Sequence, residues 1–248
     1  MKYKLLLLDV DGVLVKSKEV QISDKVIHAI SKVKNQLKIA LCTGRTRRDL
    51  QQILDVLDIN NSYHVIESGA KILNPQGVEE NIKALTPKNV NWIVTTAGGT
   101  PQGYSFCVNG IWVEDLNKIA DGQITTVSLH SLTQKQTKKI LEAIKPIFSK
   151  YHVAVASHWQ IPNGNFILIT HPEASKGLAV KYVQKKLGIA KEQTLAVGDM
   201  PNDIPLFATS GFKVAMGNAD EKLKLAADYV APSIEDDGVA DVINKYCF

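Results

Sequence analysis

Hydrophobic residues along the chain alternate between short continuous runs and stretches with one apolar face, and this alternation predicts an α/β fold. The first run, Lys4 to Val10, contains four consecutive leucines, which is typical of a strand buried on both faces of a parallel sheet. An amphipathic stretch follows, with Ser23 as its expected N-cap. The same order of strand and helix recurs up to residue 79 and again from residue 172 to the end, which indicates a doubly wound parallel sheet with helices on both faces.

The elements expected in this sheet come from the same pattern. The expected strands are Lys4–Val10, Lys38–Cys42, Tyr63–Glu67, Gln193–Val197, Lys213–Met216 and Tyr229–Ala231. The expected helices are one capped by Ser23, one that turns Leu50, Ile53, Leu54 and Leu57 inward, and then Lys176–Leu187, Asp203–Thr209, Ala219–Ala227 and Gly238–Tyr246.

The middle of the chain has a different pattern. Asn109-Gly110 lies between two apolar runs and is a strong signal for a two-residue β-hairpin. The other elements expected in this region are strands Tyr104–Val108, Ile111–Glu114, Ile124–Leu129, His152–Ala156 and Phe166–Ile169, a helix opened by Thr86-Pro87, and a helix from Ser131 or Thr133 to Phe148. We therefore expect a Rossmann-like core domain from residues 1–79 and 172–248, interrupted by an inserted α+β domain at residues 80–171.

Composition narrows the class of protein further. The 248 residues are 45% hydrophobic and 22% charged, with a formal net charge of +4 and dispersed basic residues, so a nucleic acid partner is not expected. The apolar runs are far shorter than the ~18 residues of a membrane span, and the leucine run meets Asp9 too early for a signal peptide. Cys42, Cys107 and Cys247 form no CxxC pair, which suits a reducing compartment. A cytoplasmic protein without a membrane partner is expected.

Polar residues gather where the expected parallel strands end. The segments concerned are Asp9-Val10-Asp11-Gly12, Thr43-Gly44-Arg45, Lys176, and Gly198-Asp199 through Asn202-Asp203. Each alone is an ordinary turn former or helix cap, but in a doubly wound sheet they converge on one crevice. Four aspartates in one crevice raise one another's pKa unless a cation neutralises them. Oxygen ligands favour a hard divalent ion, so we expect Mg²⁺.

The remaining residues of this group suit an anion. Thr43 offers a hydroxyl, and Gly44 offers a backbone N–H near an expected helix start. Lys176 offers an ammonium group that can neutralise a phosphoryl oxygen. The sequence therefore predicts a site in which a phosphoryl group lies between the metal ion and Lys176.

Four segments, taken together, resemble the motifs of the haloacid dehalogenase superfamily. They are Asp9-Val10-Asp11-Gly12-Val13-Leu14, Cys42-Thr43-Gly44-Arg45, Ser175-Lys176-Gly177, and Gly198-Asp199-Met200-Pro201-Asn202-Asp203. An insertion between the second and third motifs resembles type IIB, the subfamily of Cof-like sugar phosphatases, sucrose-phosphate phosphatase and archaeal phosphoglycolate phosphatase. One departure is Ser68-Gly69, where relatives often have Asn-Gly.

The resemblance implies a Mg²⁺-dependent phosphatase of small phosphate monoesters, such as sugar phosphates or phosphoglycolate. By similarity, Asp9 is the nucleophile that becomes an aspartyl-phosphate, and Asp11 is the general acid and base. The implied metal residues are Asp9, Asp11, Asp199 and Asp203, and the implied substrate-binding residues are Thr43, Gly44, Lys176 and Asn202. The inserted domain corresponds to a type C2 cap. A monomer or homodimer that acts on a small phosphorylated metabolite is expected.

Some alternatives stay open at this point. The same scaffold serves a phosphomutase or phosphotransferase, or a catalytically inactive relative that only binds a phosphorylated ligand. Arg45 is left between a role in the site and a solvated surface position. Asn165, His158 and Lys71 are expected to be ordinary surface residues. Trp92, Trp112 and Trp159 are expected to lie in the core of the inserted domain or to pack partly buried on its surface.

Overall fold

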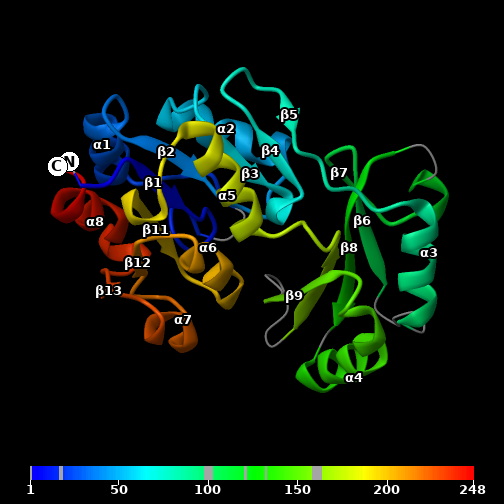
Figure 1. Cartoon of the computed structure of the whole chain (residues 1–248). Coiled ribbons are helices and arrows are strands. Elements are labelled where there is room, and N and C mark those ends of the chain that lie inside the picture. The colour runs from blue at the N-terminus through cyan, green and yellow to red at the C-terminus, as the bar shows by residue number, and fades with distance from the viewer. Residues whose placement is uncertain (1, 17–18, 98–102, 120–121, 132, 158–163) are drawn as a thin grey trace. The chain divides into compact units, whose positions relative to one another are not determined.

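The computed structural model describes residues 2–16, 19–97, 103–119, 122–131, 133–157 and 164–248 (Figure 1). His158 and Trp159, which the sequence singled out, lie outside the described residues. The chain divides into two compact units, residues 1–80 together with 176–248, and residues 81–175. We call the first the core domain and the second the inserted domain.

A five-stranded parallel sheet forms the centre of the core domain. In sheet order its strands are β13 (Tyr229–Val230), β12 (Phe212–Ala215), β11 (Thr194–Gly198), β1 (Leu5–Leu8) and β2 (Lys38–Leu41). All four leucines of β1 are fully buried, because the strand is covered on both faces and paired on both edges. The apolar run therefore marks this strand correctly.

Helices follow the strands as the amphipathic stretches predict. The α-helices of the core domain are α1 (Asp24–Val33), α2 (Arg47–Leu57), α5 (Lys176–Leu187), α6 (Ile204–Ala208), α7 (Glu221–Leu225) and α8 (Gly238–Tyr246). Short 3₁₀ turns are η1 (Glu67–Gly69), η4 (Lys191–Gln193), η5 (Pro201–Asp203) and η6 (Ile234–Asp236). The Ser23 hydroxyl accepts a hydrogen bond from the Val26 N–H and caps α1, as expected. The predicted doubly wound α/β core is confirmed.

The strand after α2 differs from the prediction. β3 (His64–Ile66) touches the end of the parallel sheet through a single bridge between Cys42 and Val65. It pairs instead in antiparallel fashion with β4 (Lys71–Leu73), which in turn pairs with β5 (Glu79–Glu80). The expected parallel strand Tyr63–Glu67 thus begins a separate three-stranded sheet. Strands of two and three residues carry too little hydrophobic pattern to be detected in the sequence.

The inserted domain is an antiparallel sheet with two helices. In sheet order its strands are β7 (Ile111–Val113), β6 (Tyr104–Val108), β8 (Ile124–Ser131), β10 (Asn165–Thr170) and β9 (His152–Ser157). Its helices are α3 (Pro87–Thr96) and α4 (Gln134–Ile144), with 3₁₀ turns η2 (Leu116–Ile119) and η3 (Lys145–Ile147). Asn109 and Gly110 both have positive φ, 51° and 76°, so they form the hairpin turn that their sequence indicates. Thr86 caps α3, and Thr133, rather than Ser131, caps α4.

Candidate active site

The candidate site residues follow three neighbouring parallel strands. Asp9 comes directly after β1, Asp199 directly after β11, and Thr43 two residues after β2. β1 pairs with β11 on one side and β2 on the other, in register, so these residues meet at one edge of the sheet. From β1 the chain continues to β2 on one side, and the later strand β11 lies on the other side. The strand order therefore reverses at β1, and ligands bind at such topological switch points.

Three carboxylates meet at this edge and are the main feature of the site. Oxygen atoms of Asp9, Asp199 and Asp203 lie within 4.8 Å of one another, and all three side chains are buried. Burial and the nearby Asp203 charge raise the pKa of Asp9 well above its ordinary value and that of Asp199 to about 7. The Asp199 Oδ1 atom is buried and accepts no hydrogen bond from any described residue. Buried carboxylate oxygens in this state fit a metal ion.

Lys176, the first residue of α5, supplies the positive charge within this group. Its Nζ lies 2.9 Å from Asp9 Oδ2 and 2.6 Å from Asp203 Oδ1. Burial lowers the pKa of Lys176, but the attraction of Asp203 and Asp9 outweighs it and raises the pKa above the ordinary value. When all three carboxylates are ionised, as metal ligands are, the single ammonium leaves two negative charges uncompensated. A divalent cation such as Mg²⁺ matches that deficit, so the residues present fit the metal that the family implies.

Both carboxylate oxygens of Asp203 accept hydrogen bonds from the protein. Its Oδ1 accepts from Lys176, and its Oδ2 accepts from the backbone N–H groups of Asp199 and Met200, at 3.1 and 3.3 Å. A Cβ at Gly198 would come within 2.7 Å of the Asp203 side chain. Because both carboxylate oxygens of Asp203 already accept hydrogen bonds, this residue fixes the positions of Lys176 and Asp199.

Gly12 makes room for the Asp199 carboxylate. Its φ is +81°, in the left-handed region, and a Cβ there would lie 1.9 Å from Asp199 Oδ2. Any other residue would collide with the carboxylate and adopt a strained backbone. The Gly12 carbonyl oxygen also accepts a hydrogen bond from the Asn218 side chain, whose own oxygen accepts from the Ile234 N–H. Asn218 thereby ties the turn after β1 to the C-terminal part of the core domain.

Asp11 is paired with Arg45, a residue for which the sequence left two roles open. The Arg45 Nε and Nη2 atoms donate to the two Asp11 carboxylate oxygens at 3.1 and 2.8 Å. Nη2 also donates to the Glu19 carbonyl oxygen at 2.7 Å. The Arg45 side chain is 10% exposed, so it is not a solvated surface arginine. Planar two-point pairs of this kind fix the direction of a carboxylate.

The segment Thr43-Gly44-Arg45 has the form of an anion-binding loop. The buried Thr43 hydroxyl accepts a hydrogen bond from the Arg45 N–H at 3.1 Å, so its own proton remains available for an acceptor. Gly44 is exposed. Thr46 caps the following helix α2, whose N-terminal end attracts negative charge. We refer to Thr43, Gly44 and Arg45 as the phosphate loop, after the ligand that their sequence predicts.

The turn Glu67–Gly69 contacts the phosphate loop, and the sequence pointed to only some residues of this turn. The Glu67 N–H donates to the Arg45 carbonyl oxygen and the Ser68 N–H to the Thr43 carbonyl oxygen, at 3.0 and 2.9 Å. Ser68-Gly69 stood out in the sequence as a departure from the family pattern. The buried Glu67 carried no signal there, since a glutamate at a strand end is an ordinary surface residue.

Lys71 corrects an expectation. It was expected on the surface, yet its side chain is 1% exposed, with its Nζ 3.2 Å from Glu67 Oε1 and 2.9 Å from Glu79 Oε2. Burial lowers the pKa of Lys71, but the bonds to Glu79 and Glu67 outweigh it and raise the pKa. The two partners explain how a lysine is accommodated there.

Asn202, another expected site residue, is half-buried in η5.

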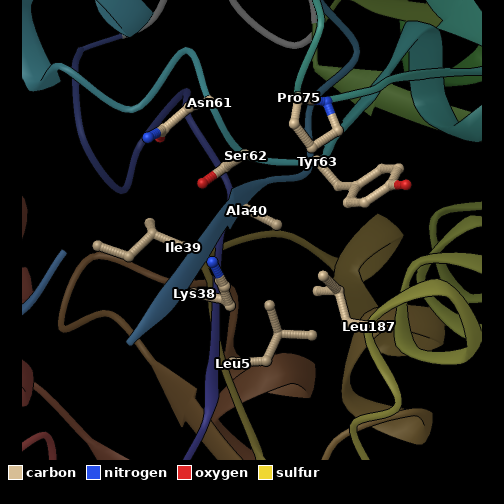
Figure 2. A pocket seen from close by; sticks show the side chains of 9 residues that line it. All are labelled: Leu5, Lys38, Ile39, Ala40, Asn61, Ser62, Tyr63, Pro75 and Leu187. Carbon is tan, nitrogen blue, oxygen red and sulfur yellow. The ribbon is translucent and has the colours of Figure 1, made fainter. Parts of the chain in front are cut away.

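A small cavity in the core domain lies at the other end of the same strands (Figure 2). Leu5 and Lys38, the first residues of β1 and β2, are part of its wall, whereas the candidate site follows the last residues of those strands. Its lining residues are Leu5, Lys38, Ile39, Ala40, Asn61, Ser62, Tyr63, Pro75 and Leu187. The lining holds no carboxylate, so this cavity is separate from the acidic site.

Among the described helices, none is both long and apolar enough to cross a membrane.

The sheet order, the inserted domain and the strand-end carboxylates together define a haloacid dehalogenase-type fold. The sequence profile of the haloacid dehalogenase-like hydrolases matches residues 6–117 and 110–243. The chain therefore belongs to this family, as its four motifs indicate.

Known relatives and solved structures agree with this assignment. The chain is 26% identical over 254 residues to a Saccharolobus solfataricus protein named phosphoglycolate phosphatase 1, with 98% of this chain and 95% of the relative covered. A haloacid dehalogenase-like hydrolase from Bacillus subtilis has the same fold, with a TM-score of 0.84, 23% identity, and coverage of 98% and 99%. A subclass IIB sugar phosphatase is also similar, with a TM-score of 0.78, 21% identity, and coverage of 98% of this chain and 99% of the other. Phosphatases of this superfamily generally use a divalent metal ion.

Proposed function

We propose that the protein is a Mg²⁺-dependent phosphatase that hydrolyses small phosphate monoesters. The observation that carries this proposal is the buried group of Asp9, Asp199, Asp203 and Lys176, in which three carboxylates share one ammonium and an Asp199 oxygen is unbonded. The adjacent phosphate loop supplies donors for the phosphoryl oxygens. A site for a divalent cation next to a site for an anion is the arrangement that phosphoryl transfer requires.

Asp9 is the proposed nucleophile. One of its carboxylate oxygens attacks the phosphorus atom, the bond from phosphorus to the ester oxygen breaks, and an aspartyl-phosphate forms. Asp11, two residues further on, gives a proton to the departing alcohol oxygen. It then takes a proton from the water that attacks the aspartyl-phosphate, which releases orthophosphate and restores the Asp9 carboxylate. Arg45 holds the Asp11 carboxylate through two hydrogen bonds.

The metal ion is proposed to be held by the carboxylates of Asp9 and Asp199 and by the backbone carbonyl of Asp11, with Asp203 as a further ligand or an anchor. When bound, it supplies positive charge to the phosphoryl oxygens. Because both Asp203 oxygens accept hydrogen bonds from the protein, the anchoring role is the one we favour for that residue.

The proposed phosphoryl-binding residues are Thr43, Gly44, Lys176 and Asn202. Thr43 donates its hydroxyl proton, and Gly44 donates its backbone N–H from an exposed position next to the start of α2. Lys176 neutralises part of the charge that develops on the transferred group. Asn202 orients the same group from the turn that follows Asp199.

The proposed leaving group is a small sugar or a small organic acid, as in the named substrates of the relatives. We propose that the inserted domain (residues 81–175) acts as a type C2 cap that selects among such groups, and that the protein acts in the cytoplasm on a phosphorylated metabolite.

The test is release of inorganic phosphate from a panel of phosphate monoesters, with Mg²⁺ or with EDTA. We expect the wild-type protein to release phosphate with Mg²⁺ alone, and the Asp9→Asn variant to release none. Transfer of phosphate to a second alcohol without release of orthophosphate would replace the hydrolase by a phosphotransferase or phosphomutase. Binding of the esters without turnover of any of them would replace it by a relative that only binds a phosphorylated ligand.

A further inference from the structure

The turn after β3 has an unusual backbone. Glu67, Ser68 and Gly69 all have positive φ, at 50°, 59° and 96°. Glycine adopts this conformation freely, but glutamate and serine are strained in it. Strain of this kind persists only where the surroundings hold the backbone in place. Contacts on two sides of the turn hold it.

On one side, the turn fixes two peptide groups of the phosphate loop. Its N–H donors bond to the carbonyl oxygens of Thr43 and Arg45. In a trans peptide the C=O and the following N–H point in opposite directions. A Thr43 carbonyl directed at Ser68 therefore directs the Gly44 N–H away from the turn. The conformation of the turn thus sets the direction of the Gly44 donor.

On the other side, the turn is joined to β4 by a buried ion pair. The Glu67 carboxylate and the Lys71 ammonium are 3.2 Å apart, and each side chain is 1% exposed. Lys71 lies opposite Ile66 in the β3–β4 pairing, so the ion pair spans the base of the turn. Glu79 on β5, whose side chain is 25% exposed, accepts from the same ammonium.

We propose that Lys71 is a positioning residue for phosphate binding: through the Glu67 carboxylate it holds the strained Glu67–Gly69 turn, and the turn holds the phosphate loop. This inference rests on the proposed function, because it assigns Lys71 to the geometry of the phosphoryl-binding part of that site. Lys71 itself touches the turn and β5, and it acts on the phosphate loop only through Glu67.

The test compares Lys71→Met, Glu67→Gln and the double variant with the wild type. Lys71→Met alone leaves the buried Glu67 charge without its ammonium partner, and stability falls. The double variant removes both charges, while the partly exposed Glu79 turns to solvent. Lys213→Met is the matched control, since Lys213 pairs with Asp228 at 3.1 Å on the surface of the core domain. Three quantities are measured: the melting temperature, orthophosphate affinity by calorimetry with Mg²⁺, and amide hydrogen exchange at Glu67 and Ser68.

We expect the double variant to recover most of the melting temperature that Lys71→Met loses. Orthophosphate affinity, in contrast, falls about tenfold or more in Lys71→Met and in the double variant. A loss of this size is expected when one donor to a charged group is misdirected. The Ser68 amide exchanges at least tenfold faster than in the wild type. Lys213→Met changes neither the orthophosphate affinity nor the exchange rate of the Ser68 amide.

Two results would overturn the inference. One is a double variant that regains wild-type orthophosphate affinity together with its stability, because Lys71 would then be structural only. The other is a Ser68 amide that stays protected when both charges are absent. A wild-type protein that neither binds orthophosphate nor hydrolyses any ester would instead overturn the proposed phosphatase, and the exchange measurement would still decide whether Lys71 holds the turn.

Discussion

The Arg45 guanidinium donates two hydrogen bonds to the Asp11 carboxylate, from Nε to Oδ2 at 3.1 Å and from Nη2 to Oδ1 at 2.8 Å. Asp11 is the proposed proton donor to the leaving group, and its side chain is 36% exposed. An exposed carboxylate has several rotamers, and the planar arginine fork selects one of them. Arg45 therefore orients the group that is proposed to protonate the leaving group.

Replacement of Arg45 by methionine is expected to slow the enzyme in a way that depends on the leaving group. Esters of aliphatic alcohols need a proton at the departing oxygen, so we expect their kcat to fall by about 10²-fold. An aryl ester such as p-nitrophenyl phosphate leaves without that proton and should lose far less. Measurement of kcat across esters of graded alcohol pKa checks this. Equal losses for all esters would contradict a role for Arg45 in orienting Asp11.

Gly12→Ala is expected to disable the metal site. The new Cβ would meet Asp199 Oδ2 at 1.9 Å, so the carboxylate must move, and Mg²⁺-dependent activity should fall by at least about 10²-fold, as expected when a reacting group is misplaced. Gly188→Ala is the matched control, because Gly188 also has positive φ but a Cβ there meets nothing within 4 Å. That variant should lose about 1 kcal/mol of stability and keep its activity. Similar losses of activity in both variants would assign the effect to backbone strain alone.

Mg²⁺ binding is expected to depend on pH through Asp199. Without a cation, the raised pKa of about 7 means that Asp199 holds a proton below that pH, and the metal must displace it. Affinity for Mg²⁺ should therefore weaken as the pH falls below 7, and binding should release protons there. Calorimetry in buffers of different ionisation enthalpy measures the release. A metal affinity that stays constant from pH 5 to pH 8 would be incompatible with Asp199 as a ligand.

His64 is expected to make the fold less stable in acid. Its ring is fully buried, with Nδ1 accepting from the Leu41 N–H at 3.1 Å and Nε2 lying 3.0 Å from the Ile59 carbonyl oxygen. Burial lowers the pKa of His64 from 6.5 to about 4, so the unfolded chain binds the proton more tightly. Stability should fall as the pH drops from about 6.5 to 4, by up to about 3 kcal/mol.

Urea unfolding of the wild type and His64→Asn between pH 4 and pH 7 tests this contribution. The variant should be less stable at pH 7 and show a flatter dependence on pH. His28→Asn, at an exposed position of α1, serves as the control and should retain the wild-type slope. An unchanged slope in His64→Asn would mean that other groups cause the acid sensitivity.

Much of the core domain could be predicted because its elements have strong local signals. The four leucines of β1 and the capped helix after Ser23 are visible in the sequence, and the ends of parallel strands place Asp9 and Asp199 together once the fold is known. The three-stranded sheet of β3, β4 and β5 could not be predicted, because pairing over two or three residues leaves no periodicity.

Burial of charged residues was the second feature that the sequence could not predict. Lys71 carries no signal of burial in its own residue type, because a lysine is almost always at the surface. What buries it is a pair of carboxylates, Glu67 and Glu79, whose proximity depends on the hairpin itself. Arg45 is similar, because its partner Asp11 lies 34 residues away and meets it only at the strand ends.

The order of strands in the core sheet has a consequence for synthesis on the ribosome. β1, which is directly followed by Asp9, needs β11 as a neighbour, and β11 is made only after the whole inserted domain. The inserted domain is one continuous stretch, residues 81–175, whose partners are all available as soon as it leaves the exit tunnel. The acidic edge of the sheet is therefore among the last parts of the nascent chain to form. Until the second segment of the core domain, residues 176–248, emerges, the growing polypeptide has an unpaired edge of apolar residues on β1 that chaperones can recognise.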